Sequence, residues 1–227
     1  MSGCRLDLVT TAEIERDGSG NLALSVRLDD ALLTELDDLA IDPTLEVTAL
    51  ASELEGWELE RTVDEEAAIT ITLTRPFADA SEMGPALRQL SSGLADADPA
   101  LLIDLDLDVA DDGSASLEGA VAFRSPMTTG AEVDGEVLGP SSDDLAELTA
   151  EVVRPRLEVA MPGPVEQHDA DQVDGRTLSW DVPVGETRGV AATSGTPMLY
   201  EQPWLWGVVA GAIVLILLVL LALRRRR

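Results

Sequence analysis

The chain contains no lysine, one cysteine and one histidine among its 227 residues, and each shortage excludes a kind of site. A single cysteine cannot form a disulfide bond within the chain. A single histidine, His168, excludes a metal site built on two imidazoles. It stands between Gln167 and Asp169 with no Gly-x-Ser-x-Gly motif in the chain to supply a nucleophile. We expect His168 to be an exposed loop residue.

Acidic residues outnumber basic ones, 43 against 15, and the formal net charge is −28. Such a charge repels nucleic acids and anionic surfaces, which argues against a nucleic-acid partner. The acids are interleaved with apolar residues, unlike those of a disordered acidic tail. They are typical of a protein that stays soluble in salt, where a Debye length of about 3 Å at 1 M screens self-repulsion. A surface that binds a specific cation is the alternative.

The densest carboxylate pattern is Asp104-Leu105-Asp106-Leu107-Asp108, which starts like a calcium-binding EF-hand loop. Val109 stands where that loop needs glycine, and Ala115 where it needs a bidentate glutamate. The alternation instead predicts a strand with leucines inward and carboxylates in water. No glycine loop for phosphate is present either, so we expect no catalytic residue, metal or cofactor, and not an enzyme.

The longest apolar run covers residues 205–223, without a charge or a proline. At 1.5 Å per residue it matches a bilayer core of about 30 Å, so it predicts a transmembrane helix over 204–223. Trp204 and Trp206 fit one membrane interface, and four cations fit the cytoplasmic one. These cations are Arg224, Arg225, Arg226 and Arg227. The prediction is a single-pass membrane protein in contact with the lipid bilayer, with residues before 204 on the extracytoplasmic side.

The cysteine, Cys4, follows Ser2-Gly3, as at the end of a bacterial lipobox. Export of about 200 residues needs a signal that these residues do not show. We therefore expect residues 1–4 to be the remnant of a lipobox, with Cys4 lipidated. An incidental cysteine is the alternative.

Period-two and helical spacings divide the remainder. Hairpins are expected around residues 17–21 and 111–114, strands at 57–63, 67–74, 156–161, 177–184 and 187–193, and helices at 29–40, 42–56 and 81–93, with Gly84-Pro85 confining the last to its later part. The Arg75-Pro76 pair should end the strand before it. A loop should fill 125–144. The predicted class is α+β, a mainly antiparallel sheet with two or three packed helices, as one extracytoplasmic domain over 5–194, joined by a linker, 195–203, to the membrane.

Trp57 and Trp180 lie inside strand patterns. Both are expected in the core, and they would line a ligand cavity if the sheet curves around one.

Several short segments follow one another in a familiar order. They are Ser-Gly-Cys before a strand, Asp-Gly-Ser-Gly at 17–20, Thr-Arg-Pro-Phe-Ala-Asp at 74–79, Met-Pro-Gly at 161–163, Asp-Gly-Arg-Thr-Leu-Ser-Trp at 174–180, Pro-Val-Gly-Glu at 183–186 and Ala-Thr-Ser at 192–194. In this order they resemble the LppM-like domain of actinobacterial lipoproteins. The resemblance implies an α+β envelope domain that contacts lipids or glycolipids, and it assigns no catalytic residue. The acid excess argues against an anionic headgroup as the ligand.

Two functions stay open on these residues. One is a membrane-anchored module that binds a lipid or glycolipid of the cell envelope. The other is a structural or protein-interaction module without a ligand cavity, whose protein partner the sequence does not identify. An apolar cavity of several hundred Å³ would favour the first.

The arginines after the apolar run yield a topology prediction. Protease added to intact spheroplasts should digest the domain before residue 204, because the arginines hold the C-terminus in the cytoplasm. Immunoblotting against the domain measures this. Full protection of the domain, while a control protein of the outer face is cleaved, would reverse the orientation.

Overall fold

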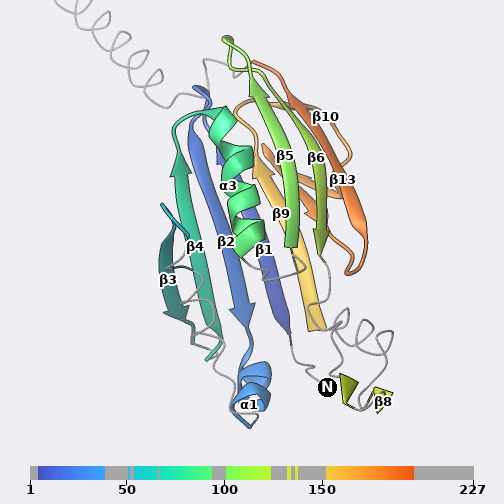
Figure 1. The fold of residues 1–227 in the computed structure, drawn as a ribbon. Helices are drawn as coiled ribbons and strands as arrows, with labels where there is room; N and C mark the ends of the chain where they lie inside the picture. Colours follow the sequence, from blue (N-terminus) through green and yellow to red (C-terminus); the bar gives the residue numbers. More distant parts are fainter. Residues whose placement is uncertain are drawn as a thin grey trace, which may run out of the picture.

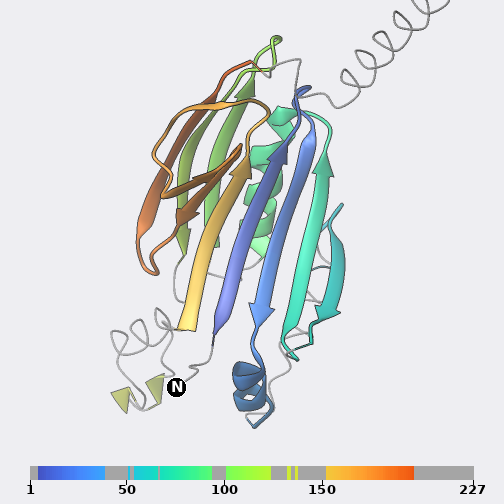
Figure 2. The ribbon, with the colours of Figure 1, turned by 180° about the vertical axis from the view of Figure 1, so that it is seen from behind.

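Two layers of β-structure make up the protein (Figures 1 and 2). The computed structural model describes residues 5–38, 51, 54–65, 67–93, 101–123, 132–133, 136–137 and 152–196. The strands are β1 (Leu6–Ile14), β2 (Gly20–Leu28), β3 (Glu58–Val63), β4 (Ile69–Phe77), β5 (Leu101–Val109), β6 (Ala115–Phe123), β7 (Glu132–Val133), β8 (Glu136–Val137), β9 (Val153–Ala160), β10 (Val165–His168), β11 (Gln172–Asp174), β12 (Thr177–Asp181) and β13 (Thr187–Ser194). The helices are α1 (Asp30–Asp38) and α3 (Ala80–Gly93).

The larger sheet has seven strands in the order β11-β12-β9-β1-β2-β4-β3. Its central strand, β1, pairs antiparallel with β2 and parallel with β9, so it joins the two ends of the domain sequence. The other sheet has the order β10-β13-β6-β5 and is antiparallel. The β7–β8 pair is a separate two-stranded ribbon.

Helix α3 lies beside β5 and, with the four-stranded sheet, covers one face of the larger sheet (Figure 1). Gly84 permits this close approach, because a Cβ there would stand 3.0 Å from the carbonyl oxygen of Leu105. The Ser91 hydroxyl accepts a hydrogen bond from the Ile103 amide at 3.1 Å, so the helix also satisfies the free edge of β5.

The core fills the space between the layers. Even-numbered residues of β1 and β2 and odd-numbered residues of β4 and β9 point into it. Trp180 is fully buried, and its indole nitrogen donates to the Asp169 carboxylate at 2.8 Å. Asp169 also accepts from the Ala191 amide of β13, so one carboxylate ties the two sheets together.

The predicted α+β class is wrong, because strands dominate the described residues and form two sheets. Of the two described helices only α3 packs on the core; the described side chains of α1 are not buried. The helical spacing predicted α1 correctly, but it does not indicate whether the helix packs on the sheet. The strands β10 and β11 escaped prediction because their exposed residues show no apolar alternation.

The hairpins around residues 17–21 and 111–114 are confirmed, and so are the strand predictions over β3, β4, β9, β12 and β13. Two proline expectations are wrong. Strand β4 runs through Pro76 to Phe77, since β3 pairs only as far as Thr74 and leaves that edge unpaired. Helix α3 runs through Pro85 from Ala80.

Several expectations fall on residues outside those described. These are the helix over most of 42–56, most of the loop over 125–144, the linker over 197–203 and the transmembrane helix over 204–223. Within the described residues, no helix combines the length and the apolar character that a membrane crossing needs.

The N-terminus of α3 supports a stability prediction. The Asp79 carboxylate accepts from the Ser81 amide at 2.9 Å, and the Glu82 carboxylate accepts from the Ala78 amide, as in a helix cap. The Ser81 hydroxyl and amide lower the pKa of Asp79 below its ordinary 3.8. Asp79→Ala should lower the melting temperature by a few degrees at neutral pH, and Asp79→Ser by less.

The same cap predicts a pH dependence. A lowered pKa in the folded protein means that the stabilisation is present above pH 3.8 and is lost as the pH falls through the lowered pKa. Thermal unfolding of the wild type and Asp79→Ala at a series of pH values should therefore show the two converging in acid. A difference that is constant down to pH 2 would contradict the ionised cap.

Candidate functional site

The outer face of the seven-stranded sheet carries the candidate site. This face points away from α3 and the smaller sheet (Figure 2). A hollow of about 740 Å³ lies over β2, β1 and β9 near the start of β1. We call it the arginine groove, after its charged lining residues Arg5, Arg27, Arg154, Arg156, Asp7 and Asp181.

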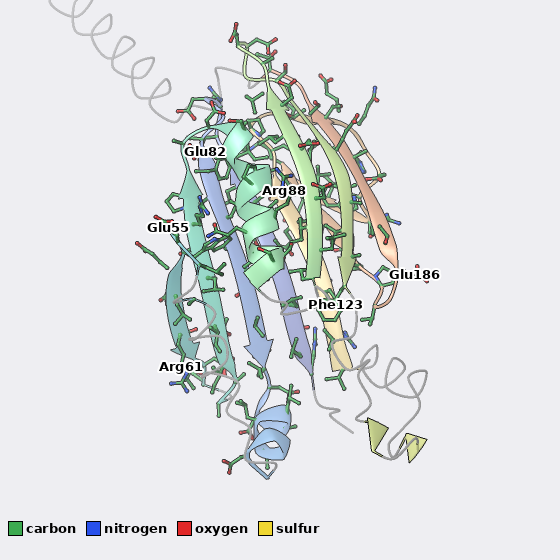
Figure 3. The ribbon with its side chains drawn as sticks, viewed as in Figure 1. Glu55, Arg61, Glu82, Arg88, Phe123 and Glu186 are labelled. Atoms are coloured by element: carbon green, nitrogen blue, oxygen red, sulfur yellow. The ribbon has the colours of Figure 1, made fainter. Side chains whose placement is uncertain are left out.

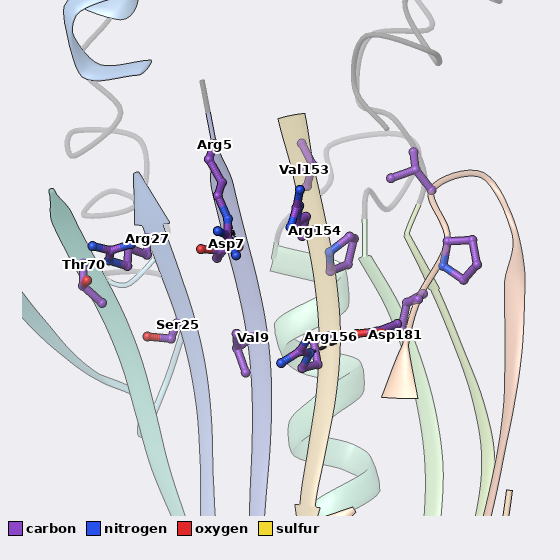
Figure 4. Close-up of a pocket in the computed structure, with 14 residues that line it drawn as sticks. Arg5, Asp7, Val9, Ser25, Arg27, Thr70, Val153, Arg154, Arg156 and Asp181 are labelled. Carbon is purple, nitrogen blue, oxygen red and sulfur yellow. Dashed lines mark hydrogen bonds and ion pairs between the residues drawn. The ribbon is translucent and has the colours of Figure 1, made fainter. Parts of the chain in front are cut away.

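Strand register brings these side chains together (Figure 4). In the strand register, Asp7 lies opposite Arg27 of β2 on one side and opposite Arg154 of β9 on the other, so the three residues form a row across the sheet. The next row on the same face holds Ser25, Val9 and Arg156. Because residues two apart on a strand share a face, the groove follows directly from these pairings.

Three of the four arginines are paired with carboxylates. Arg5 Nε lies 2.8 Å from Asp7 Oδ1, Arg27 Nη2 lies 2.7 Å from Asp64 Oδ2, and Arg156 Nε lies 3.0 Å from Asp181 Oδ1. Their side chains are 51, 39 and 41 % exposed, so each pair contributes only about 0–1 kcal/mol to stability. Stability therefore does not explain why the arginines are gathered here.

Arg154 differs from the other three. It is exposed, and its guanidinium forms no ion pair or hydrogen bond with the described residues. It lines the groove, two positions before Arg156 on β9. Its five N–H donors are thus available to a ligand.

The rest of the described surface carries mostly the opposite charge. On β5 the carboxylates of Asp104, Asp106 and Asp108 face outward, as the sequence predicts. Among the described residues, Asp104 alone of the three has an arginine partner, Arg88 of α3, at 3.1 Å. The lowered pKa values of Asp17 and Asp112 belong to hairpin turns, where the hydroxyl and then the amide of Ser19 and Ser114 donate to them. The groove is thus a local excess of cations on an acidic domain.

Guanidinium groups at this spacing suit an anion with several oxygens, such as a phosphate, because each offers a planar pair of donors. Hydroxyls of Ser25 and Thr70 complete the lining together with apolar side chains, which are those of Val9, Val153, Pro155, Val182, Pro183 and Val184. In the described part of the chain, no group of three carboxylate, histidine or cysteine side chains is placed to hold a metal ion. The arrangement can bind and orient such an anion.

The residues proposed from sequence lie elsewhere. Trp180 and Trp57 are buried in the core, at 0 and 7 % exposure, and neither lines the groove. His168 is exposed at the end of β10. Cys4, Trp204, Trp206, Arg224, Arg225, Arg226 and Arg227 lie outside the described residues.

Sequence reasoning missed the groove, although a signal was present. Arg154-Pro155-Arg156 places two cations on one face of a strand in a chain with few cations. Arg27 stands in a strand pattern as well, and Arg5 immediately before one. Their convergence depends on the parallel pairing of β1 with β9, which the sequence does not reveal.

The sequence matches no protein-family model and no curated protein sequence. Among solved structures, the chain is similar to the folded domain of LppM from Mycobacterium tuberculosis, determined by NMR, with 13 % identity and a TM-score of 0.46. The similarity covers 88 % of this chain and 95 % of that one. It concerns the fold alone, as a distant likeness, and nothing about function is taken from it.

The groove generates a charge prediction. Asp7→Asn breaks the Arg5–Asp7 ion pair and removes the carboxylate that stands between Arg27 and Arg154 in register, so it should lower the free energy of unfolding by up to about 1 kcal/mol at low salt. The loss should shrink in 1 M salt, where charges are screened within about 3 Å. Arg154→Gln, which breaks no described ion pair, should stay within about 0.5 kcal/mol of wild type. Urea unfolding at both salt concentrations measures these differences, and a salt-independent loss in Asp7→Asn would contradict the electrostatic cause.

Proposed function

We propose that this protein is a non-enzymatic, membrane-tethered domain on the extracytoplasmic side, which binds the anionic headgroup of a lipid or glycolipid in the arginine groove. The observation that carries the proposal is the gathering of four of the chain's arginines in one hollow of a strongly acidic domain. Exposed like charges repel one another, so their concentration without a gain in stability indicates a ligand of opposite charge.

The groove supports recognition of a headgroup more than of acyl chains. It is open, and arginines from three positions on β2 and β9 converge on it. The space between the layers is instead filled by core side chains such as Leu22, Leu157 and Trp180, all essentially inaccessible to water. A bound lipid would therefore keep its apolar chains in the bilayer. The expectation that the acid excess excludes anionic headgroups is replaced, since charge is distributed unevenly over the surface.

The membrane tether rests on the sequence. The run over 205–223 is long and apolar enough for a bilayer core, and the four terminal arginines orient it. A tether places the domain where lipid headgroups are concentrated, so modest affinity suffices for occupancy.

A second candidate is a protein-interaction module. One observation favours it: β3 is an edge strand whose six residues are all exposed, including Leu59 and Val63. An exposed edge is a template for pairing with another chain. In that case the arginine groove would have no part in binding.

The binding test uses two matched double variants of the full chain in neutral detergent micelles. Wild type should bind short-chain dihexanoyl phosphatidylglycerol and not dihexanoyl phosphatidylcholine. Arg27→Gln with Arg154→Gln should weaken binding by about tenfold or more, since each hydrogen bond to a charged group is worth about 1.5–3 kcal/mol. Isothermal titration calorimetry measures the affinities.

The control is Arg61→Gln with Arg88→Gln. It removes the same charge and likewise one paired and one unpaired arginine among the described residues, but outside the groove (Figure 3). Its affinity should stay close to wild type. Equal weakening in both double variants, or no binding by wild type, would reject the groove as a headgroup site and favour the interaction module.

A further inference from the structure

The groove and the C-terminal end of the described domain lie at opposite ends of the sheet. Strand β1 starts beside the groove and ends at Ile14. At that far end, Gly18 of the β1–β2 turn lies against Val109 of β5, and the last strand, β13, ends at Ser194 beside Val165 and the start of β6. The nine residues of β1 make eight steps of about 3.4 Å, so its first and last residues are about 27 Å apart.

Eight residues, 197–204, separate the described domain from the apolar run. At 3.6 Å per residue they span at most about 29 Å. An upright domain, standing on its C-terminal end, would hold even the nearer row of the groove, at Val9 and Arg156, about 17 Å or more above the bilayer, because five steps of about 3.4 Å separate Val9 from Ile14. The groove reaches that bilayer only if the domain tips over.

The charges of the two broad faces select the side on which it tips. The outer face of the smaller sheet presents Asp104, Asp106, Asp108 and Glu118. On the larger sheet, the groove half presents four arginines against Asp7, Asp64 and Asp181, while the half toward Ile14 carries Glu13, Glu158 and Asp174. An anionic bilayer therefore attracts the groove half and repels the smaller sheet.

We infer that the domain lies along the membrane that its own C-terminal segment enters, with the groove half of the seven-stranded sheet against the lipid headgroups and the four-stranded sheet toward solvent. This inference rests on the proposed function, because the headgroups that hold the domain down are those that the groove binds. The lining mixes arginines and the hydroxyls of Ser25 and Thr70 with apolar side chains such as Val9 and Val184, and the arginines place the contact at the headgroup level.

The test places single fluorophores on the full chain in vesicles of equal parts phosphatidylglycerol and phosphatidylcholine. In a Cys4→Ser background, Thr62→Cys marks the groove half, because Thr62 of β3 pairs with Thr70 in the row of Asp7 and is exposed. Asn21→Cys marks the far half of the same face, and Asp106→Cys marks the opposite face. A quencher attached to lipid headgroups reports which label is near the bilayer.

The expected order is strongest quenching at Thr62→Cys, less at Asn21→Cys and least at Asp106→Cys. Quenching at Thr62→Cys should fall at least twofold in vesicles of phosphatidylcholine alone, in 1 M salt, or when Arg154→Gln is added. Arg88→Gln, a control that removes the same charge from the other layer, should leave it unchanged.

Stronger quenching at Asn21→Cys than at Thr62→Cys would mean an upright domain and overturn the inference, as would quenching at Asp106→Cys equal to that at Thr62→Cys. Short-chain lipid titration of the same proteins separates the two claims. If the groove binds phosphatidylglycerol in micelles while the labels report an upright domain, only the orientation is wrong. If neither is observed, the proposed function fails with it.

Discussion

The pairing of β1 with β9 is the contact on which the rest of the structure depends. It is the parallel ladder in the seven-stranded sheet, and it joins residues near position 6 to residues near position 153. On the inner face it places Leu8 and Ala12 against the strand that carries Leu157 and Val159. On the outer face it places Asp7 beside Arg154. The same β1–β9 pairing therefore determines the packing of the core on one face of the sheet and the lining of the groove on the other.

Local structure was largely predictable, because it depends on neighbours in sequence. The alternation in 6–14 and 22–28 with a glycine-rich turn between them predicted the first hairpin, and the structure supplies its register. For the same reason, the alternating aspartates of β5 were correctly predicted to lie on the solvent-facing side of a strand. Tertiary pairing was not predictable, since nothing in Val153–Ala160 indicates which strand lies beside it. Because the strand neighbours could not be predicted, neither the division into two sheets nor the fold class was predicted correctly.

The candidate site was missed for a related reason. Net charge is a property of the whole chain, and its value of −28 suggested that every part of the surface repels anions. Charge at a site depends on which strands are neighbours. The groove's cations come from the first hairpin, with Arg5 just before β1 and Arg27 on β2, and from β9, which is distant in sequence. Trp57 and Trp180 were considered as cavity-lining residues, but Trp180 is buried in the core and donates a hydrogen bond to Asp169. The clustered arginines therefore give the groove a local excess of positive charge on a chain that is acidic as a whole.

The opposite placement of the two chain ends also has a mechanical meaning. The described chain enters the larger sheet at the start of β1 and leaves the smaller sheet at the end of β13, at the far end of the molecule. Tension between these points acts along the strands, whereas the ladder hydrogen bonds run across them. The bonds of β1 to β2 and β9 would then be loaded in shear and share the force, instead of opening one at a time as in a pulled zipper. A domain with this geometry resists stretching along its length far better than peeling from one edge.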